Sequence, residues 1–250
     1  MAHPRTLPDH IADYLIAKIF IGELRPGDRL PPERLFADQL GVDRTSLRMA
    51  LRQLARMNLI RSVQGSGITI TDYCEHSGID FLACVVSIEQ LDLGGRFLLD
   101  ALEQWVFFMP QTIMLAANRP ETRAQSPLIA ALLDRQRAAL EPTPNIADIV
   151  HIEIELQNTL NRQLGSVMMR LISNSTLLLR QRIVQLFFEH NDPAKHIGFH
   201  QWILEQALSG EIRGYRLMDH YRHYLKDATQ PLREYLCSLP PEPRLLRSPL

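Results

Sequence analysis

The chain has 250 residues, 46% of them hydrophobic, so it is long enough to bury one large core or two smaller ones. Its 27 Lys and Arg residues nearly balance its 28 Asp and Glu residues, so the overall charge does not indicate a nucleic-acid partner. The three cysteines form no CxxC pair, which argues against a zinc knuckle or a disulfide framework. We therefore expect a reducing, cytoplasmic setting. The most apolar stretch stops at Pro110, too soon to span a membrane, so no membrane partner is expected.

The near-neutral average conceals an uneven distribution of charge. Residues 1–70 carry 10 Lys and Arg against 7 Asp and Glu, a net charge of +3. The remaining residues carry 17 against 21, a net charge of −4. Only the N-terminal part of the chain is basic, so any contact with nucleic acid is expected there.

The basic segment begins with two predicted helices. Ile11, Leu15 and Ile19 recur at helical spacing, and the Gly- and Pro-rich stretch "GELRPGDRLPP" then ends the first helix and forms an extended connector. The next helix, "ERLFADQL", is short, because Gly41 follows it directly and can turn the chain sharply in a left-handed conformation. Asp43 is the expected N-cap of a third helix.

The third helix combines a buried stripe with a row of arginines. Apolar residues recur at the spacing that buries one helical face, at positions 47, 50, 51, 54 and 55. The opposite side carries arginines at positions 44, 48, 52 and 56. After this helix, "NLIRSV", "QGSG" and "ITIT" predict a strand, a glycine-rich tip and a second strand. Three helices and a hairpin predict a winged helix-turn-helix domain over residues 1–73.

Beyond Tyr73 the sequence is helical in its periodicity, and no convincing strand is found. We expect a linker over residues 74–80 and an all-α antiparallel helical bundle over residues 81–238, with its prolines at helix junctions. Residues 239–250 contain four prolines and are expected to form a disordered tail. The fold class expected is thus an N-terminal α+β winged helix-turn-helix followed by an all-α effector and dimerisation domain.

The arginine row has two interpretations. It is either a solvated helix face or the DNA-contacting face of a recognition helix, whose N-terminal end enters the major groove. In the second case Arg44 and Arg48 lie near base edges, where a guanidinium binds guanine with two hydrogen bonds, and Thr45 and Ser46 contact phosphate. Arg52 and Arg56 rotate away from the groove.

The stretch "LPPERLFADQLGVDRTSLRMALRQLARMNLIRSVQGSGITI" resembles the DNA-binding domain of the GntR superfamily over about forty residues. The resemblance implies a homodimer that binds a palindromic double-stranded DNA operator. It also implies which residues contact DNA: Arg34, Arg44, Thr45, Ser46 and Arg48 on the helices, and Gln64, Gly65, Ser66 and Gly67 in the wing.

The helical second half resembles the FadR-like branch of that family, which implies one of two effectors. One version binds small carboxylates through a metal held by an acidic residue, a histidine four residues later and two further histidines. Alignment of "LNRQLGS" puts Glu153, Gln157, His200 and Arg222 at those positions. A shifted set, His151, Glu155, His200 and His223, is the alternative. Because Gln157 is a poor metal ligand, we expect no metal and no other cofactor.

The other version binds a long-chain acyl-CoA without metal. It is favoured by "TDYCEHSGIDFLACVV" and "DHYRHYL", which resemble segments of the metal-free members, although Arg222 stands where those have glycine. The candidate ligand residues are aromatic or basic: Phe107, Phe108, Phe187, Trp202, Arg213, Tyr221, Arg222 and His223. The aromatic ones have ordinary core packing as their alternative role.

An enzyme is the contrasting class of function. The sequence contains no G-x-S-x-G elbow, P-loop, HExxH or Rossmann glycine pattern. The sequence therefore predicts a regulator of fatty acid metabolism, released from its operator by long-chain acyl-CoA or another small metabolite, and not an enzyme.

Overall fold

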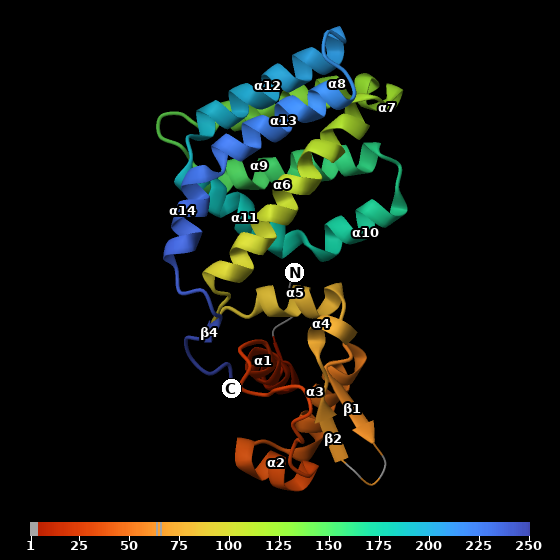
Figure 1. Ribbon diagram of the computed structural model, residues 1–250, viewed down its shortest axis with the longest axis vertical. Helices are drawn as coiled ribbons and strands as arrows, with labels where there is room; N and C mark the ends of the chain where they lie inside the picture. The colour runs from red at the N-terminus through yellow and green to blue at the C-terminus, as the bar shows by residue number, and fades with distance from the viewer. Residues whose placement is uncertain (1–4, 64, 66) are drawn as a thin grey trace. The chain divides into compact units, whose positions relative to one another are not determined.

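The computed structural model (Figure 1) describes residues 5–63, 65 and 67–250. It divides into two compact units, one of Met1–Gly94 with Glu242–Leu250 and one of Gly95–Pro241. The chain therefore leaves the first unit once and returns to it at its C-terminal end. The first unit is larger than the domain expected over residues 1–73, because the predicted linker and tail belong to it.

The first unit begins with the helices α1 (Leu7–Phe20), α2 (Glu33–Leu40) and α3 (Arg44–Arg56). α1 packs on α3 through side chains without solvent exposure, among them Leu15, Leu47 and Leu54. Between α2 and α3, Gly41 adopts a left-handed conformation with φ of 66°, which a side chain would strain. The predicted sharp turn between the second and third helices is thus present.

A two-stranded hairpin follows, formed by β1 (Ile60–Val63) and β2 (Gly67–Ile70). The strands are antiparallel, with Ile60 opposite Ile70. The connector between α1 and α2 extends along β2, since the amide of Leu30 donates to the carbonyl of Ile68 at 2.9 Å and Arg29 forms an isolated bridge with Thr69. The three helices and the hairpin form the predicted winged helix-turn-helix.

The expected linker over residues 74–80 is instead mostly helical. It contains α4 (Tyr73–His76) and the start of α5 (Ile79–Ser87). Tyr73 and Phe81 lie with ring centroids 5.0 Å apart, and both rings contact Phe20 at the end of α1. Packing of these three aromatic rings holds the segment against the first unit, which the helical period of the sequence does not reveal.

The tail expected to be disordered is paired instead. β4 (Arg244–Leu245) is antiparallel to β3 (Leu91–Asp92), and the guanidinium of Arg244 donates to Asp92 at 2.9 Å. The amide of Leu246 donates to the carbonyl of Gln90 at 2.8 Å. The expectation of no strand beyond Tyr73 is also wrong, because these two-residue strands are too short to show an alternating pattern.

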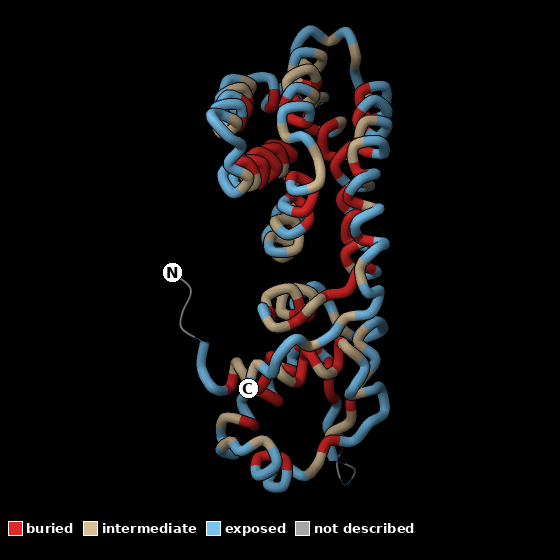
Figure 2. The backbone as a smooth tube through the Cα atoms, turned by 90° about the vertical axis from the view of Figure 1, so that its left-hand side faces the viewer, coloured by how far each residue is buried: buried red, intermediate tan, exposed pale blue. Residues whose placement is uncertain are grey.

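Every regular element of the second unit is a helix (Figure 1). These are α6 (Gly95–Ala117), α7 (Pro120–Ala124), α8 (Ser126–Ala138), α9 (Ile146–Gln163), α10 (Val167–Ser175), α11 (Leu177–His190), α12 (Pro193–Ser209), α13 (Tyr215–Ala228) and α14 (Gln230–Ser238). α6 contacts α9, α11, α13 and α14, and α9 contacts α8, α10 and α11. In Figure 2 the buried positions gather on the inner sides of these helices.

Two helix boundaries differ from the sequence pattern. Pro110 lies inside α6 rather than at a junction, and it is buried. The helical period also does not show the break between α10 and α11 at Thr176, whose hydroxyl donates back to the carbonyl of Ile172 at 2.9 Å. Among the residues described, no helix combines the length and apolar character that a bilayer crossing requires.

Candidate DNA interface and effector cavity

The N-terminal end of α3 presents polar side chains on the face opposite its buried stripe. Arg44, Thr45 and Arg48 are exposed and Ser46 is half-buried. The carboxylate of Asp43 caps the helix by accepting the amide hydrogen of Ser46 at 2.9 Å. Hydrogen bonds from Ser46 lower the pKa of Asp43, so the cap is ionised at neutral pH. The helix therefore starts at a fixed point, with three exposed donor side chains in its first two turns.

Arg48 has an acidic partner that the sequence pattern does not reveal. Its Nε and Nη2 atoms lie 3.1 and 2.8 Å from Oε2 of Glu33, at the start of α2. Hydrogen bonding to Glu33 raises the pKa of Arg48. No acidic residue within α3 lies near Arg48, because its partner Glu33 comes from another helix. This exposed pair orients the arginine more than it stabilises the fold.

The other predicted DNA contacts are distributed around this end of the unit. Arg34 is exposed on α2, and Gly65 and Gly67 are exposed in the hairpin tip with φ of 77° and 85°. Gln64 and Ser66 lie outside the described residues. Ala55, which the sequence pattern assigns to the buried stripe, is exposed.

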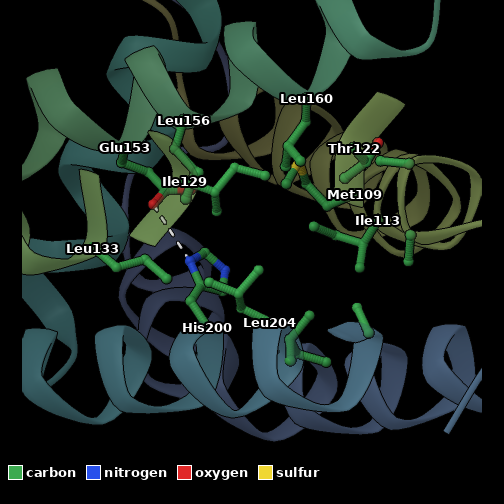
Figure 3. A pocket seen from close by; sticks show the side chains of 14 residues that line it. Met109, Ile113, Thr122, Ile129, Leu133, Glu153, Leu156, Leu160, His200 and Leu204 are labelled. Carbon is green, nitrogen blue, oxygen red and sulfur yellow. Dashed lines mark ion pairs between the residues drawn. The ribbon is translucent and has the colours of Figure 1, made fainter. Parts of the chain in front are cut away.

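The second unit contains an apolar cavity of about 50 Å³ between α6, α7, α8, α9 and α12 (Figure 3). Most of its wall is aliphatic, including Ile113, Ile129 and Leu156. The exceptions are Thr122, Glu153 and His200. In Figure 3, Glu153 and His200 approach each other from opposite helices at one end of the space.

Glu153 has no solvent exposure, and its carboxylate is held by amide donors. Gln136 donates to Oε2 and Gln157 donates to Oε1, each at 3.1 Å. Gln157 in turn accepts a hydrogen bond of 2.9 Å from the Arg180 guanidinium. Burial lowers the pKa of Arg180 to about 10, and Glu153 partly opposes that shift. Arg180 therefore stays charged at neutral pH and, half-buried, supplies the cation of this hydrogen-bonded network.

Two histidines complete the polar end of the cavity. Nε2 of His200 lies 2.6 Å from the hydroxyl of Tyr221, and Nδ1 of His196 lies 2.9 Å from the hydroxyl of Tyr224. The second nitrogen of each ring is buried without a hydrogen-bond partner among the described residues. Burial lowers the pKa of both imidazoles, so both are neutral at pH 7.

Glu153, His196 and His200 together form a candidate cation site. One ligating atom each from Glu153, His196 and His200 lies within 4.8 Å of the others, and Nδ1 of His200 is 3.6 Å from Oε2 of Glu153. Neutral imidazoles and a carboxylate are ligands for Zn²⁺ and similar ions, and two orphaned buried nitrogens fit such an ion. Tyr221 and Tyr224 would orient the rings from behind.

The structure brings together only part of either predicted metal set. Glu153 and His200 are in the cluster, but the third member is His196, four residues before His200 in "HIGFH". That spacing puts two imidazoles on one helix face, and this pattern in the sequence indicates a pair of ligands that neither predicted set contains. In the shifted set, His151 and His223 are exposed and Glu155 pairs with Arg135 on the outside of the bundle.

The predicted acyl-CoA residues do not line the cavity. Phe107 and Phe108 are 60% and 51% exposed, because they lie on the outer face of α6. Phe187 is buried against Trp105 and His196. It therefore packs in the hydrophobic core, the alternative role expected for the aromatic residues of this set.

The remaining candidates of that set are scattered. Trp202 is half-buried against Phe199, and Tyr221 is buried beside His200. Arg222 pairs with Asp219 on the surface, and His223 is exposed. Arg213 lines a separate hollow. Helical period alone does not reveal which face of α6, α12 or α13 borders the cavity.

Residues 7–70 match the family model for bacterial regulatory proteins of the gntR family. This match assigns the N-terminal segment of the chain to the GntR family. The chain is 36% identical over 157 residues to the uncharacterized HTH-type transcriptional regulator Rv0494 of Mycobacterium tuberculosis, covering 63% of each chain. The chain thus spans less than two thirds of the length of that relative.

Two further likenesses of the chain extend over more of its length. It is 26% identical over 224 residues to the fatty acid metabolism regulator protein of Edwardsiella ictaluri, covering 86% of each chain. The solved structure of Lar, described as controlling expression of the Listeria monocytogenes agr system, covers 94% of this chain and 99% of its own, with 17% identity and a TM-score of 0.55. The predicted fold class, a winged helix-turn-helix followed by an all-helical domain, is confirmed.

The hydrogen-bonded chain around Glu153 predicts an unequal effect for two arginines of α11. Arg180→Met should lower the free energy of unfolding by about 3 kcal/mol, because it leaves Gln157, Asn158 and the carbonyl of Ser173 without their charged donor. Arg182→Met, at an exposed position of the same helix, should change it by less than about 0.5 kcal/mol. Urea unfolding of both variants measures the difference. Equal losses of stability would contradict the role of Arg180 as the charged donor of this network.

Proposed function

We propose that this protein is a transcription regulator that binds operator DNA through α3 and the hairpin, and that an effector bound in the helical unit controls this binding. The observation that carries the DNA-binding part is the exposed, capped N-terminal end of α3, with Arg44, Thr45 and Arg48 on one face. Such a helix end fits the major groove of DNA. In this proposal Arg44 and Arg48 contact base edges and phosphates, and Thr45 and Ser46 contact phosphates.

The hairpin and the second helix extend the proposed interface. Arg34 on α2 is exposed and available to a phosphate. The wing proposed from the sequence, residues 64–67, would contact the groove next to the one that α3 enters. We propose a homodimer on a palindromic operator, since a two-fold protein matches two half-sites about one helical turn apart.

The proposed role of α3 predicts a graded series of substitutions. Arg44→Ala and Arg48→Ala should each weaken binding to the specific operator by about ten- to a hundredfold, and Arg56→Ala, two turns farther along α3, should have little effect. Glu33→Ala combined with Arg48→Ala should bind no more weakly than Arg48→Ala alone, because Glu33 acts by orienting that arginine. Fluorescence anisotropy at fixed salt measures each affinity. Additive losses from Glu33→Ala and Arg48→Ala would contradict the orienting role.

For the effector, we propose a long-chain acyl-CoA that releases the protein from DNA. Two observations support it: the aliphatic wall of the cavity, and the similarity to a fatty acid metabolism regulator protein over 86% of both chains. The volume of about 50 Å³ is far below the several hundred cubic ångströms of typical ligand pockets. An acyl chain therefore requires α12 to separate from α6 and α8, and this change couples ligand binding to DNA release.

Acyl-chain binding predicts a dependence of affinity on chain length. Each methylene buried in the cavity contributes about 0.8 kcal/mol, so calorimetry should show the affinity rising from octanoyl-CoA to palmitoyl-CoA, with operator release in the same order. Free CoA is the matched control, since it lacks the chain. If free CoA binds as tightly as palmitoyl-CoA, the acyl chain is not what the cavity recognises.

A second candidate effector is a small organic acid bound through a metal ion. The observation that favours it is the cluster of Glu153, His196 and His200 at the end of the cavity, with two nitrogens lacking partners. These three residues would hold the ion, which leaves coordination positions for a ligand carboxylate. The size of the cavity favours this candidate, whereas the composition of its walls favours the acyl chain.

The metal candidate predicts a response of thermal stability to divalent ions. Addition of Zn²⁺ or Ni²⁺ to chelator-treated protein should raise the melting temperature by several degrees, because an ion that binds only the folded state stabilises it. His200→Ala and His196→Ala should each abolish this rise. His151→Ala, at an exposed position, should retain it. Unchanged melting with and without metal would exclude this candidate.

A further inference from the structure

A second hollow in the helical unit is rich in arginine. It has a volume of about 510 Å³ and is lined by Arg119, Arg123 and Arg213, from α7 with its preceding residue and from the loop after α12. Ala117 and Ala207 line both this hollow and the apolar cavity. The two spaces are therefore neighbours, with walls that share two small side chains.

Among the described residues, no carboxylate forms an ion pair with any of the three arginines of the hollow, Arg119, Arg123 and Arg213. Arg123 donates to the main-chain carbonyl of Leu208, which leaves its charge uncompensated. Gly210 has a φ of 75°, and a Cβ at that position would collide with the guanidinium of Arg213, so the glycine allows this arginine to lie against the loop. Three arginines without a carboxylate partner among the described residues thus line one hollow.

We propose that this hollow binds phosphate groups of the effector, while the apolar part of the same molecule enters the neighbouring cavity. The proposal rests on the effector-binding function given above and identifies the part of that site that binds the anionic half of the ligand. The guanidinium group forms paired hydrogen bonds with phosphate oxygens, and a phosphate monoester carries close to two negative charges. A ligand with several phosphate charges matches three arginines better than a single carboxylate does.

The residues that line the two spaces support one continuous site. Thr122 faces the apolar cavity, whereas the next residue, Arg123, faces the hollow. Likewise Leu204 lines only the cavity, and Ala207, one turn later in α12, lines both. A ligand that spans the two spaces would contact α7 and α12 together. The ligand class is therefore an amphiphile with a phosphate-bearing head and an apolar tail.

The test uses the full-length protein and four probes: palmitoyl-CoA, free CoA, palmitate and inorganic phosphate. The main variant is Arg119→Gln with Arg213→Gln, which leaves the contact between Arg123 and Leu208 intact. The control is Arg216→Gln, an exposed arginine of α13 outside the hollow. Thermal melting confirms that both variants are folded, and calorimetry measures the affinity for each probe.

The double variant should bind palmitoyl-CoA and free CoA at least about tenfold more weakly than the wild type does, and its affinity for palmitate should be unchanged. The wild-type affinity for CoA should fall as salt is added. Inorganic phosphate that displaces CoA in the wild type, and not in the double variant, would place the phosphate contact at these arginines.

The outcomes separate this inference from the proposed function. If palmitoyl-CoA releases the wild type from DNA and the double variant binds it equally well, the hollow is not the phosphate site, and the proposed function stands. If CoA binds in an arginine-dependent way but no acyl-CoA affects DNA binding, the phosphate site stands and the proposed effector is wrong. Failure of every phosphate-bearing probe to bind the wild type would overturn the inference.

Discussion

A carboxylate without solvent exposure, Glu153, is the constraint on which the helical unit depends. An ionised group in such a place is costly unless donors surround it, and α8 and α9 supply two amides for this purpose. The amide of Gln157 is in turn held by Arg180 of α11, so the hydrogen-bonded chain connects three helices. Aliphatic packing tolerates many arrangements of helices, whereas this chain of polar contacts has one. The buried carboxylate thus fixes the end of the cavity at which a polar or cationic group can bind.

The first unit is organised differently, with the side chains proposed to contact DNA on the outside. Its core is an aliphatic contact between α1 and α3, and the arginines occupy the face of α3 that this contact leaves in solvent. Two carboxylates then set the geometry of the exposed end. Asp43 fixes where α3 begins, and Glu33 holds the side chain of Arg48. Stability and proposed DNA contact are therefore assigned to opposite faces of one helix, and substitutions on the outer face can change binding without unfolding the unit.

Regulation requires that an effector bind one arrangement of the protein better than another, and a tenfold change in DNA affinity corresponds to about 1.4 kcal/mol of coupling. The helical unit has two features that suit this need. Its cavity is too small for most ligands as it stands, and its polar end contains two nitrogens without partners. A ligand or ion that satisfies those nitrogens, or that separates α12 from α6 and α8, changes the energy of the helix packing. The short helix α7 and the C-terminal part of α12 border both the cavity and the arginine-lined hollow, so a ligand in either space would contact these elements.

The sequence by itself determined the winged helix-turn-helix, the exposed arginines of α3 and the helical nature of the second half. These features depend on local patterns: helical spacing of apolar residues, the turn at Gly41, the cap at Asp43 and the glycines of the hairpin. Only the tertiary structure decided the partners that come from other segments. Glu33 reaches Arg48 from the preceding helix, and β4 pairs with β3 from the far end of the chain. His196 joins Glu153 and His200, while Phe107 and Phe108 face outward. The physical reason is that periodicity identifies the apolar face of a helix but not the neighbour it packs against, and a site between helices is defined by those neighbours.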